Sequence, residues 1–356
     1  MTEVFFEDVV GPLSLLNRMM KEGYVRASYH PDNQYLTVWN YTPKAQYEQV
    51  WNDVTLNCRG LITMYNRVMS RPFPKFFNLA EMDETPTGAY TVKPKFDGSL
   101  GIAYLHPDGH PAISTRGSFT SDQALWATRW LRDRGAERQW VLQRLHEGQT
   151  PLFEIIYPEN RVVVDYHGLE ALVYLTTLDN ATALDVVSDH RWPGIGAKNL
   201  LGEIGGLLSD PIPNAEGYVL TWRDGTRAKL KFDEYVRLHK LLTGVNERTI
   251  WQALSSGTPS IEKLVEHVPD EFYHWVHAAV DRLKDAYTQI EMEARDEFSR
   301  IPMDVDRRTQ AGIILKSPLK SILFAMLDGK DYSQTIWKMI KPEPTPAFFN
   351  RSEDEA

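Results

Sequence analysis

The sequence predicts an α+β fold, in which a domain rich in antiparallel strands is followed by a small all-helical domain. Short runs of β-branched and aromatic residues recur up to about residue 240, and turn residues separate many of them. Few of these runs alternate with long helices in the way that is typical of a parallel sheet. Beyond about residue 243, apolar residues instead recur at the i, i+3, i+4 spacing of helices.

The strands expected in the first domain share a length and composition that suit a half-buried sheet. They cover residues 35–41, 90–96, 100–105, 151–157, 160–166, 169–178, 216–222 and 227–232. Asp-Gly pairs at 97–98 and 108–109 indicate tight turns. A helix is expected over 121–135, because Ser121 can cap it and apolar residues follow at helical spacing.

The second domain is expected to consist of helices, with segments over 258–269, 270–300 and 317–329. We therefore expect domains over residues 1–243 and 244–340. The remainder, 341–356, is rich in proline and then acidic, which predicts a flexible tail.

Composition narrows the class of protein. A single cysteine, Cys58, excludes an internal disulfide framework and a zinc site made of several cysteines. No apolar run approaches the roughly 20 residues of a membrane span, so we expect a cytoplasmic protein with no membrane partner. The net charge of −9 argues against a protein that coats nucleic acid without selection. It leaves room for an enzyme that gathers positive charge in one groove.

The segment KPKFDGSLGIAY, residues 93–104, places Lys95 at the end of an expected strand, directly before the turn at Asp97–Gly98. Rigid structure would then hold this lysine and direct it away from the strand edge. An isolated match of this kind is more often a solvated lysine before an ordinary hairpin. The interpretation of Lys95 as a nucleophile therefore depends on other residues.

Two carboxylates and two lysines supply that context. Glu154 lies in one expected strand and Glu216 opens another, while Lys229 and Lys231 lie on the same face of a third. Neighbouring lysines on a solvated edge strand are one interpretation, and lysines facing an anion are the other. A lysine amine attacks only when it is neutral, so we expect Lys93, Lys229, Lys231 and a metal ion to lower the pKa of Lys95.

Taken together and in this order, these residues resemble the covalent nucleotidyltransferases: ATP-dependent RNA and DNA ligases and mRNA capping enzymes. Over roughly residues 35–240 the chain is most similar to the phage-type RNA ligase 1 family. The segments that carry this likeness besides Lys95 are CRGLI with Arg59, PKFFNLAE with Lys75 and Phe77, STRGSF with Arg116, and DEYVRLHK with Tyr235. The helical C-terminal part lacks the strand-rich pattern of the OB-fold domain that DNA ligases and capping enzymes usually carry.

The resemblance implies an antiparallel-rich nucleotidyltransferase domain of the ATP-grasp-like ligase type. It also implies an ATP-dependent RNA ligase that uses Mg²⁺ or Mn²⁺. In that reaction Lys95 takes AMP from ATP, AMP moves to the 5′-phosphate end of an RNA, and a 3′-hydroxyl displaces AMP to seal the strand.

The same resemblance assigns roles to individual residues. Lys95, Glu154, Lys229 and Lys231 would carry the chemistry, and Glu216 would place the metal. The expected ATP contacts are Tyr41, Arg59, Lys75, Phe77, Arg116, Glu216, Lys229, Lys231 and Tyr235. Arg116 stands where the family has lysine, which keeps the charge but changes the geometry of a phosphate contact.

The resemblance further suggests a monomer of viral or bacterial origin that repairs single-stranded or broken-loop RNA, such as a cleaved tRNA. A DNA ligase or a GTP-using capping-type enzyme is the first alternative. A non-catalytic RNA-binding protein of the same fold is the second. A decayed enzyme is expected to have lost one of five residues, and all five are present: Lys95, Glu154, Glu216, Lys229 and Lys231.

Overall fold

The computed structural model describes residues 3–186, 191–200, 204–209, 211–256 and 270–343, together with residues 261, 265 and 268. The helix predicted over 258–269 lies mostly outside these residues, as does the predicted tail from residue 344 onward. The chain divides into two compact units, and the division between Arg237 and Leu238 falls inside helix α8 (Asp233–Gly244). Within the described ranges, no helix combines the length and apolar character needed to cross a membrane.

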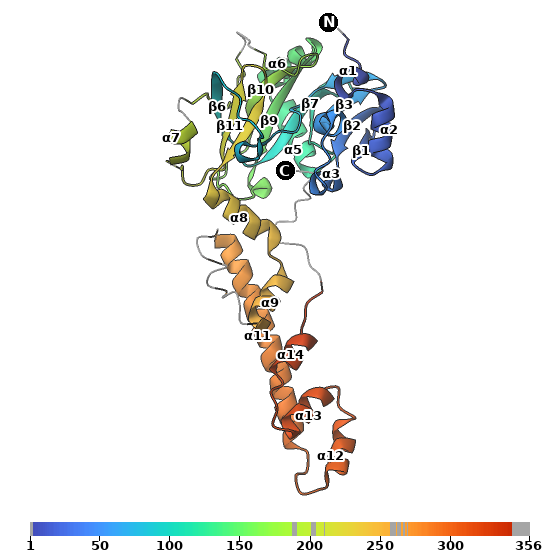
Figure 1. Cartoon of the computed structure of the whole chain (residues 1–356), viewed down its shortest axis with the longest axis vertical. Coiled ribbons are helices and arrows are strands. Elements are labelled where there is room, and N and C mark those ends of the chain that lie inside the picture. Colours follow the sequence, from blue (N-terminus) through green and yellow to red (C-terminus); the bar gives the residue numbers. More distant parts are fainter. Residues whose placement is uncertain are drawn as a thin grey trace. The chain divides into compact units, whose positions relative to one another are not determined.

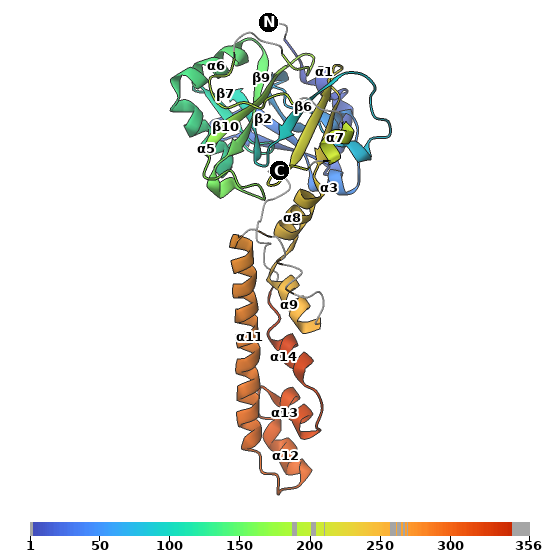
Figure 2. The same cartoon turned by 90° about the vertical axis from the view of Figure 1, so that its left-hand side faces the viewer.

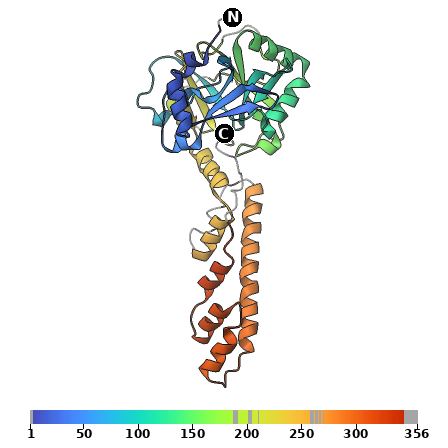
Figure 3. The same cartoon turned by 90° about the vertical axis from the view of Figure 1, so that its right-hand side faces the viewer.

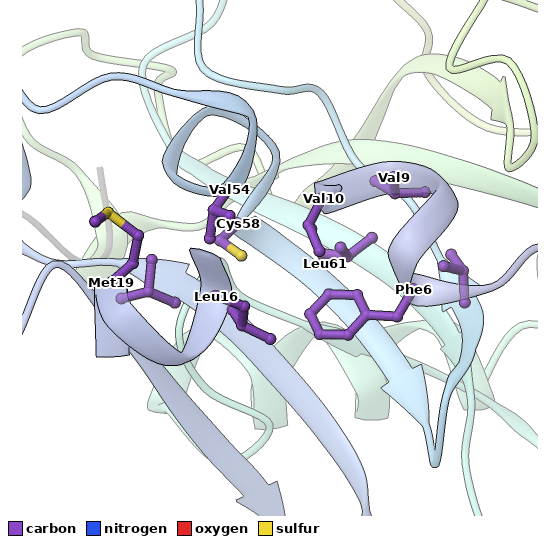
Figure 4. Close-up of a cluster of buried hydrophobic side chains, with 10 residues drawn as sticks. Phe6, Val9, Val10, Leu16, Met19, Val54, Cys58 and Leu61 are labelled. Atoms are coloured by element: carbon purple, nitrogen blue, oxygen red, sulfur yellow. The ribbon is translucent and has the colours of Figure 1, made fainter. Parts of the chain in front are cut away.

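The first sheet of the first unit is antiparallel and lies near the N-terminus. Its strands, in spatial order, are β1 (Val25–His30), β2 (Asn33–Tyr41), β3 (Arg59–Met64) and β4 (Arg67–Ser70). Four short helices accompany it: α1 (Phe6–Val10), α2 (Leu13–Lys21), α3 (Pro43–Tyr47) and α4 (Asp53–Asn57). Apolar residues of α1, α2 and α4, among them Phe6, Leu16 and Val54, pack with Leu61 of β3 in one buried cluster (Figure 4). The blue helix α2 and the blue strands of this sheet are visible together in Figure 3.

The second sheet is antiparallel throughout. Its strands, in spatial order, are β10 (Ala171–Asp179), β9 (Gln149–Ile156), β7 (Ser99–Leu105) and β8 (Pro111–Ser114). Helices α5 (Asp122–Arg132) and α6 (Gly135–His146) cover one face of it (Figure 2). Apolar residues of both helices, such as Leu131 and Val141, pack with Phe153 of β9.

The third sheet carries the residues that the sequence singles out. Its strands, in spatial order, are β5 (Phe77–Asn78), β12 (Arg227–Lys231), β11 (Gly217–Trp222) and β6 (Tyr90–Lys95). Only the short pairing of β5 with β12 is parallel. Single turns of 3-10 helix, η1 (Leu79–Glu81) and η2 (Pro158–Asn160), and helix α7 (Ile204–Ser209) complete the described elements of this unit (Figure 1).

The predicted α+β class is confirmed, but one predicted strand is wrong. Residues 161–166 have no strand, although their composition suits one. The backbone N–H groups of Val163 and Val164 instead donate to the Asp97 carboxylate, at 2.8 and 2.9 Å. Donors used in this way are not available to a sheet ladder. Strands β1, β3, β4, β5 and β8 were not anticipated, whereas the Ser121 cap of α5 was.

The second unit is helical wherever it is described. After the end of α8 it contains α9 (Glu247–Ser256), α11 (Asp270–Ser299), α12 (Arg307–Ile314), α13 (Lys320–Leu327) and α14 (Ser333–Met339). Helices α9, α13 and α14 contact the long helix α11. The unit has a core of its own, made by Ala294, Ile314, Ile322, Leu323 and Ile336 with their neighbours.

Candidate active site

Lys95 and Lys231 are held on either side of one glycine. Lys95 ends β6 and pairs with Gly217 of the central strand β11, and Lys231 of β12 pairs with the same Gly217 from the other side. Gly217 has a φ of 140°, and a Cβ there would lie 2.0 Å from the Leu230 carbonyl oxygen. Any other residue would therefore clash with the backbone of β12.

Glu216, the residue before this glycine, joins the two lysines. Its side chain is only 2 % exposed, and its Oε2 and Oε1 each accept a hydrogen bond of 2.9 Å, from Lys95 Nζ and Lys231 Nζ respectively. A buried carboxylate with two cationic partners is well satisfied, whereas its loss would leave two lysines facing each other. The structure thus brings Lys95, Glu216 and Lys231 into direct contact.

Glu154 approaches the same lysine from the second sheet. It lies on β9, and its Oε1 accepts a hydrogen bond of 2.9 Å from the Gly98 N–H. A Cβ on Gly98 would lie 2.6 Å from the Ile155 carbonyl oxygen, so the Asp97–Gly98 turn rests directly on β9. Burial raises the pKa of Glu154 to about 7, with Lys95 opposing this effect and Glu216 adding to it. Glu154 therefore changes its protonation near neutral pH.

The charge state of Lys95 differs from the sequence prediction. Burial lowers the pKa of Lys95, but Glu216 and Glu154 outweigh this effect and raise it above its ordinary value. The expectation that surrounding lysines lower this pKa is therefore wrong for the protein without nucleotide. Glu216 neutralises the influence of Lys231, and Lys93 is turned away, because its Nζ donates to the Leu175 carbonyl oxygen at 2.7 Å.

Asp97 anchors the turn that follows Lys95. Its Oδ2 takes the two backbone donors of Val163 and Val164, and its Oδ1 accepts a hydrogen bond of 2.7 Å from the Tyr235 hydroxyl. Its own N–H donates to the Tyr166 hydroxyl at 2.7 Å. Asp97 and Tyr166 are positioning residues that the sequence did not identify. Tyr235 is buried in this contact, and its expected role at ATP stays a prediction.

A second group of residues faces the site with positive charge and aromatic rings, and we call it the basic–aromatic wall. Its members are Tyr41, Trp51, Arg59, Lys75, Phe76, Phe77, Arg116 and Lys229. Arg116 Nη1 donates to the Tyr41 hydroxyl at 2.9 Å. Lys75 Nζ lies 4.9 to 5.5 Å from the ring centroids of Tyr41, Trp51 and Phe77. Tyr41, Arg59, Lys75, Phe77, Arg116 and Lys229 were predicted, whereas Trp51 gave no signal in the sequence.

Phe76 connects the two remaining cations of the wall. Its ring centroid lies 5.0 Å from Lys229 Nζ and 5.8 Å from Arg59 Cζ. Burial lowers the pKa of Lys229 well below its ordinary value, and the charges of Arg59, Lys95 and Lys75 lower it further. Burial likewise lowers the pKa of Lys75. The structure therefore places Phe76 in the wall.

Several donors of the wall lack anionic partners. Arg59 Nη1 is buried and has no hydrogen-bond partner among the described residues. Among the described residues, no carboxylate lies at ion-pair distance from Lys75 or Lys229. Buried or crowded positive groups without counter-charges are costly, and a bound anion such as a polyphosphate would satisfy them. The wall therefore fits the phosphates of a nucleotide.

Comparison with known proteins agrees with this geometry. The sequence profile of the RNA ligase family matches residues 57–193. A Thermovibrio ammonificans protein provisionally described as an RNA ligase is 29% identical over 197 residues, which is 50% of this chain and 50% of that protein. The chain thus spans about half the length of this curated relative.

A solved structure supports the fold. An archaeal ATP-dependent RNA ligase superposes with a TM-score of 0.50 at 13% sequence identity, over 92% of this chain and 98% of that one. The family match on residues 57–193 includes Arg59, Lys75, Lys95, Arg116 and Glu154, and the structure brings Glu216, Lys229 and Lys231 to them from later strands. The segment of this chain over residues 57–193, which carries Lys95 and Glu154, is therefore similar to the RNA ligase family.

Proposed function

We propose that this chain is an ATP-dependent RNA ligase that joins a 5′-phosphate end to a 3′-hydroxyl end. One observation carries the proposal. Lys95 is held against the buried carboxylate of Glu216, at 2.9 Å, beside a wall whose cations Arg59, Lys75 and Lys229 have no carboxylate partner among the described residues. A nucleophile and a group of cations that can bind phosphates are the two parts that nucleotidyl transfer requires.

The residues fit ATP and a divalent ion. Arg59, Lys75 and Lys229 would contact the phosphates, and the rings of Tyr41 and Phe77 offer apolar surface beside them. Arg116 would add charge next to Tyr41. Glu216 and Glu154 offer the oxygen ligands that Mg²⁺ and Mn²⁺ prefer. Such an ion would neutralise part of the charge on the phosphates when it is bound.

In the first step Lys95 must give up its proton before it attacks. Glu154, with a pKa of about 7, is suited to accept that proton, and its charge already acts on Lys95. The Lys95 nitrogen then forms a bond to the α-phosphorus of ATP. The bond from that phosphorus to the bridging oxygen breaks, and its electron pair leaves with pyrophosphate. Lys229 and Lys231 would stabilise the charge on the transferring group.

The later steps restore the lysine. An oxygen of the RNA 5′-phosphate attacks the phosphorus of the lysine adduct, the phosphorus–nitrogen bond breaks, and the amine takes up a proton. The RNA 3′-hydroxyl then loses its proton to solvent and forms a bond to the phosphorus of the adenylylated 5′-phosphate. The bond from that phosphorus to the bridging oxygen breaks, and its electron pair leaves with AMP. Both steps reuse the same cations, because negative charge again develops on a transferring phosphoryl group, with the Lys95 amine as the leaving group in the first step and AMP in the second.

The test is covalent labelling followed by ligation. The full chain is incubated with Mg²⁺ and either α-labelled ATP or α-labelled GTP, and the adduct is then chased with 5′-phosphorylated single-stranded RNA. We expect a stable adduct from ATP and circular or joined RNA, with 5′-hydroxyl RNA as the unreactive control. Label from GTP alone, or a nicked DNA duplex sealed in preference to RNA, would replace this proposal with the capping-type or DNA ligase alternative.

The natural RNA and the role of the helical domain are finer parts of the proposal. We propose that a monomer acts on broken-loop RNA such as a cleaved tRNA, and that the helical domain over 244–340 selects this RNA. A chain ending at residue 249 should then keep adenylation and lose its preference for a cleaved stem-loop over linear RNA. A folded but unadenylated shortened chain would contradict this division of roles. Light scattering of the purified full chain would test the monomer.

A further inference from the structure

We propose that His30, Asp32 and His106 form a binding site for one divalent transition-metal ion such as Zn²⁺, separate from the nucleotide site. His30 ends β1, Asp32 lies in the turn to β2, and His106 directly follows β7. One nitrogen of each histidine and one oxygen of Asp32 all lie within 4.8 Å of one another. In the sequence the ten histidines show no metal-ligand spacing, because two separate hairpins form this cluster.

The ring of His106 is oriented by a carboxylate on the nitrogen that would not bind the metal. Its Nδ1 lies 2.9 Å from Asp108 Oδ1 and 3.2 Å from the Asp108 backbone nitrogen, and the shorter contact requires a proton on Nδ1. The lone pair is then on Nε2, which lies 3.5 Å from Asp32 Oδ2. A carboxylate that receives the second N–H of a ligand histidine is the usual support of metal-bound imidazole. Asp108 is fixed in turn by Arg132, at 2.9 Å.

The two ring nitrogens of His30 also have different partners. Its Nδ1 accepts a hydrogen bond of 3.1 Å from the Asp32 N–H, so its proton is on Nε2, which lies 3.2 Å from the Tyr104 hydroxyl. A metal ion would take this Nδ1 lone pair in place of the Asp32 N–H.

The distances suit a small tetrahedral ion after a modest closure. Bonds of about 2.0–2.1 Å place the ligand atoms of a tetrahedral ion about 3.4 Å apart. The contact of 3.5 Å between His106 and Asp32 already has this separation. Asp32 can shorten its own contacts, because its side chain is 66% exposed. Two imidazoles with one carboxylate favour Zn²⁺ over Mg²⁺, which prefers oxygen ligands alone.

An ion at this position would join two sheets of the first unit. His30 and Asp32 belong to the β1–β2 hairpin of the first sheet, and His106 belongs to the β7–β8 hairpin of the second. Between these sheets Leu36 and Ile102 already share a buried cluster. The ion would add a cross-link at the exposed edge of that cluster. We therefore expect Zn²⁺ to raise the melting temperature of the chain.

The experiment is metal titration of the full chain without a histidine tag, after chelation and removal of the chelator. Calorimetry with Zn²⁺, and the visible absorption of Co²⁺, should give one ion per chain with a dissociation constant of roughly micromolar or tighter. Asp32→Ala and His106→Ala should each weaken binding at least tenfold. Asp108→Asn should weaken it by about 10- to 100-fold through the orientation of His106.

His110→Ala is the matched control, because this exposed histidine lies on the same hairpin and contacts the cluster only through its backbone. It should bind Zn²⁺ like the unchanged chain. Zn²⁺ binding that survives in the Asp32→Ala, His106→Ala double variant would belong to another site and would overturn the proposal. A dissociation constant above about 100 µM would also overturn it, leaving the cluster as an ordinary polar contact between hairpins.

Discussion

Lysine pKa values are shifted in opposite directions on the two sides of the candidate active site. On the acidic side, Lys95 and Lys231 share the buried Glu216, and the pKa of Lys95 is raised. On the basic–aromatic wall, Lys75 and Lys229 have no carboxylate partner among the described residues, and burial lowers their pKa values. The lysines of the acidic side thus have a carboxylate partner within the protein, whereas a bound anion would have to serve as the partner for the lysines of the wall.

If Lys95 is the nucleophile, as we propose, this difference indicates how its reactivity would be controlled. In the protein alone Lys95 is charged and paired, so it does not react. A nucleotide bound at the wall would bring negative charge to Lys229, and a metal ion would compete with Lys95 for Glu216. The metal ion would thus remove part of the negative charge that holds the Lys95 ammonium in place. The structure therefore favours a site in which substrate binding precedes activation of Lys95.

The largest expected effect is on the acidic side. Lys95→Ala should abolish both adenylation and sealing, because no other amine takes the place of the covalent nucleophile. Adduct formation from labelled ATP would measure this, and a loss of at least roughly 1,000-fold is expected. Lys93→Met is the matched control, since Lys93 lies on the same strand but donates to the Leu175 carbonyl oxygen. A Lys95→Ala chain that still carries AMP would show that the nucleophile is another residue.

The next largest effect compares one lysine of the wall, Lys229, with one lysine of the acidic side, Lys231. Lys229→Ala should slow adenylation by about 100- to 1,000-fold, because a preorganised cation near the transferring phosphate is lost. Lys231→Ala should also impair adenylation, since it removes one partner of the buried Glu216. The rate of adduct formation should fall in both variants before any RNA is added. Normal adduct formation with poor sealing would mean that these lysines serve RNA binding alone.

Local sequence patterns predicted where most of the compared lysines lie. The Asp-Gly turn placed Lys95 at a strand end, and strand periodicity placed Lys229 and Lys231 on one face, as the structure shows. What they did not predict depends on residues far apart in the chain. The opposite pKa shifts need Glu216 beside Lys95, and the missing strand at 161–166 needs Asp97 to take its backbone donors. Neither contact leaves a trace in the spacing of neighbouring residues.

Glu154 offers a measure of how strongly the acidic side is desolvated. Its pKa is raised to about 7, so the folded state favours its protonated form. That advantage is present below the unfolded pKa of about 4.3 and is lost as the pH rises through about 7. Relative to Glu154→Gln, the free energy of unfolding should therefore fall by about 3 kcal/mol between pH 4.5 and pH 8. Urea unfolding of both chains at several pH values would measure this difference.

The Glu154→Gln reference is suitable because the Gln side chain can still accept the Gly98 N–H. Its own amide does not titrate in this range, so other groups that change with pH cancel in the difference. Equal pH dependence of the two chains would mean that Glu154 keeps an ordinary pKa. The acidic side would then be more hydrated than its burial indicates.

The smallest expected effect tests whether Tyr235 belongs to the acidic side or to the nucleotide. The Tyr235 hydroxyl donates to the Asp97 carboxylate, and the backbone N–H of the same Asp97 donates to the Tyr166 hydroxyl. Tyr235→Phe should cost about 1–2 kcal/mol of stability and lower kcat for adenylation roughly tenfold, because the turn after Lys95 loosens. Tyr166→Phe should act in the same direction, and KM for ATP should stay unchanged in both. A raised KM in Tyr235→Phe alone would instead establish the nucleotide contact that the family resemblance implies.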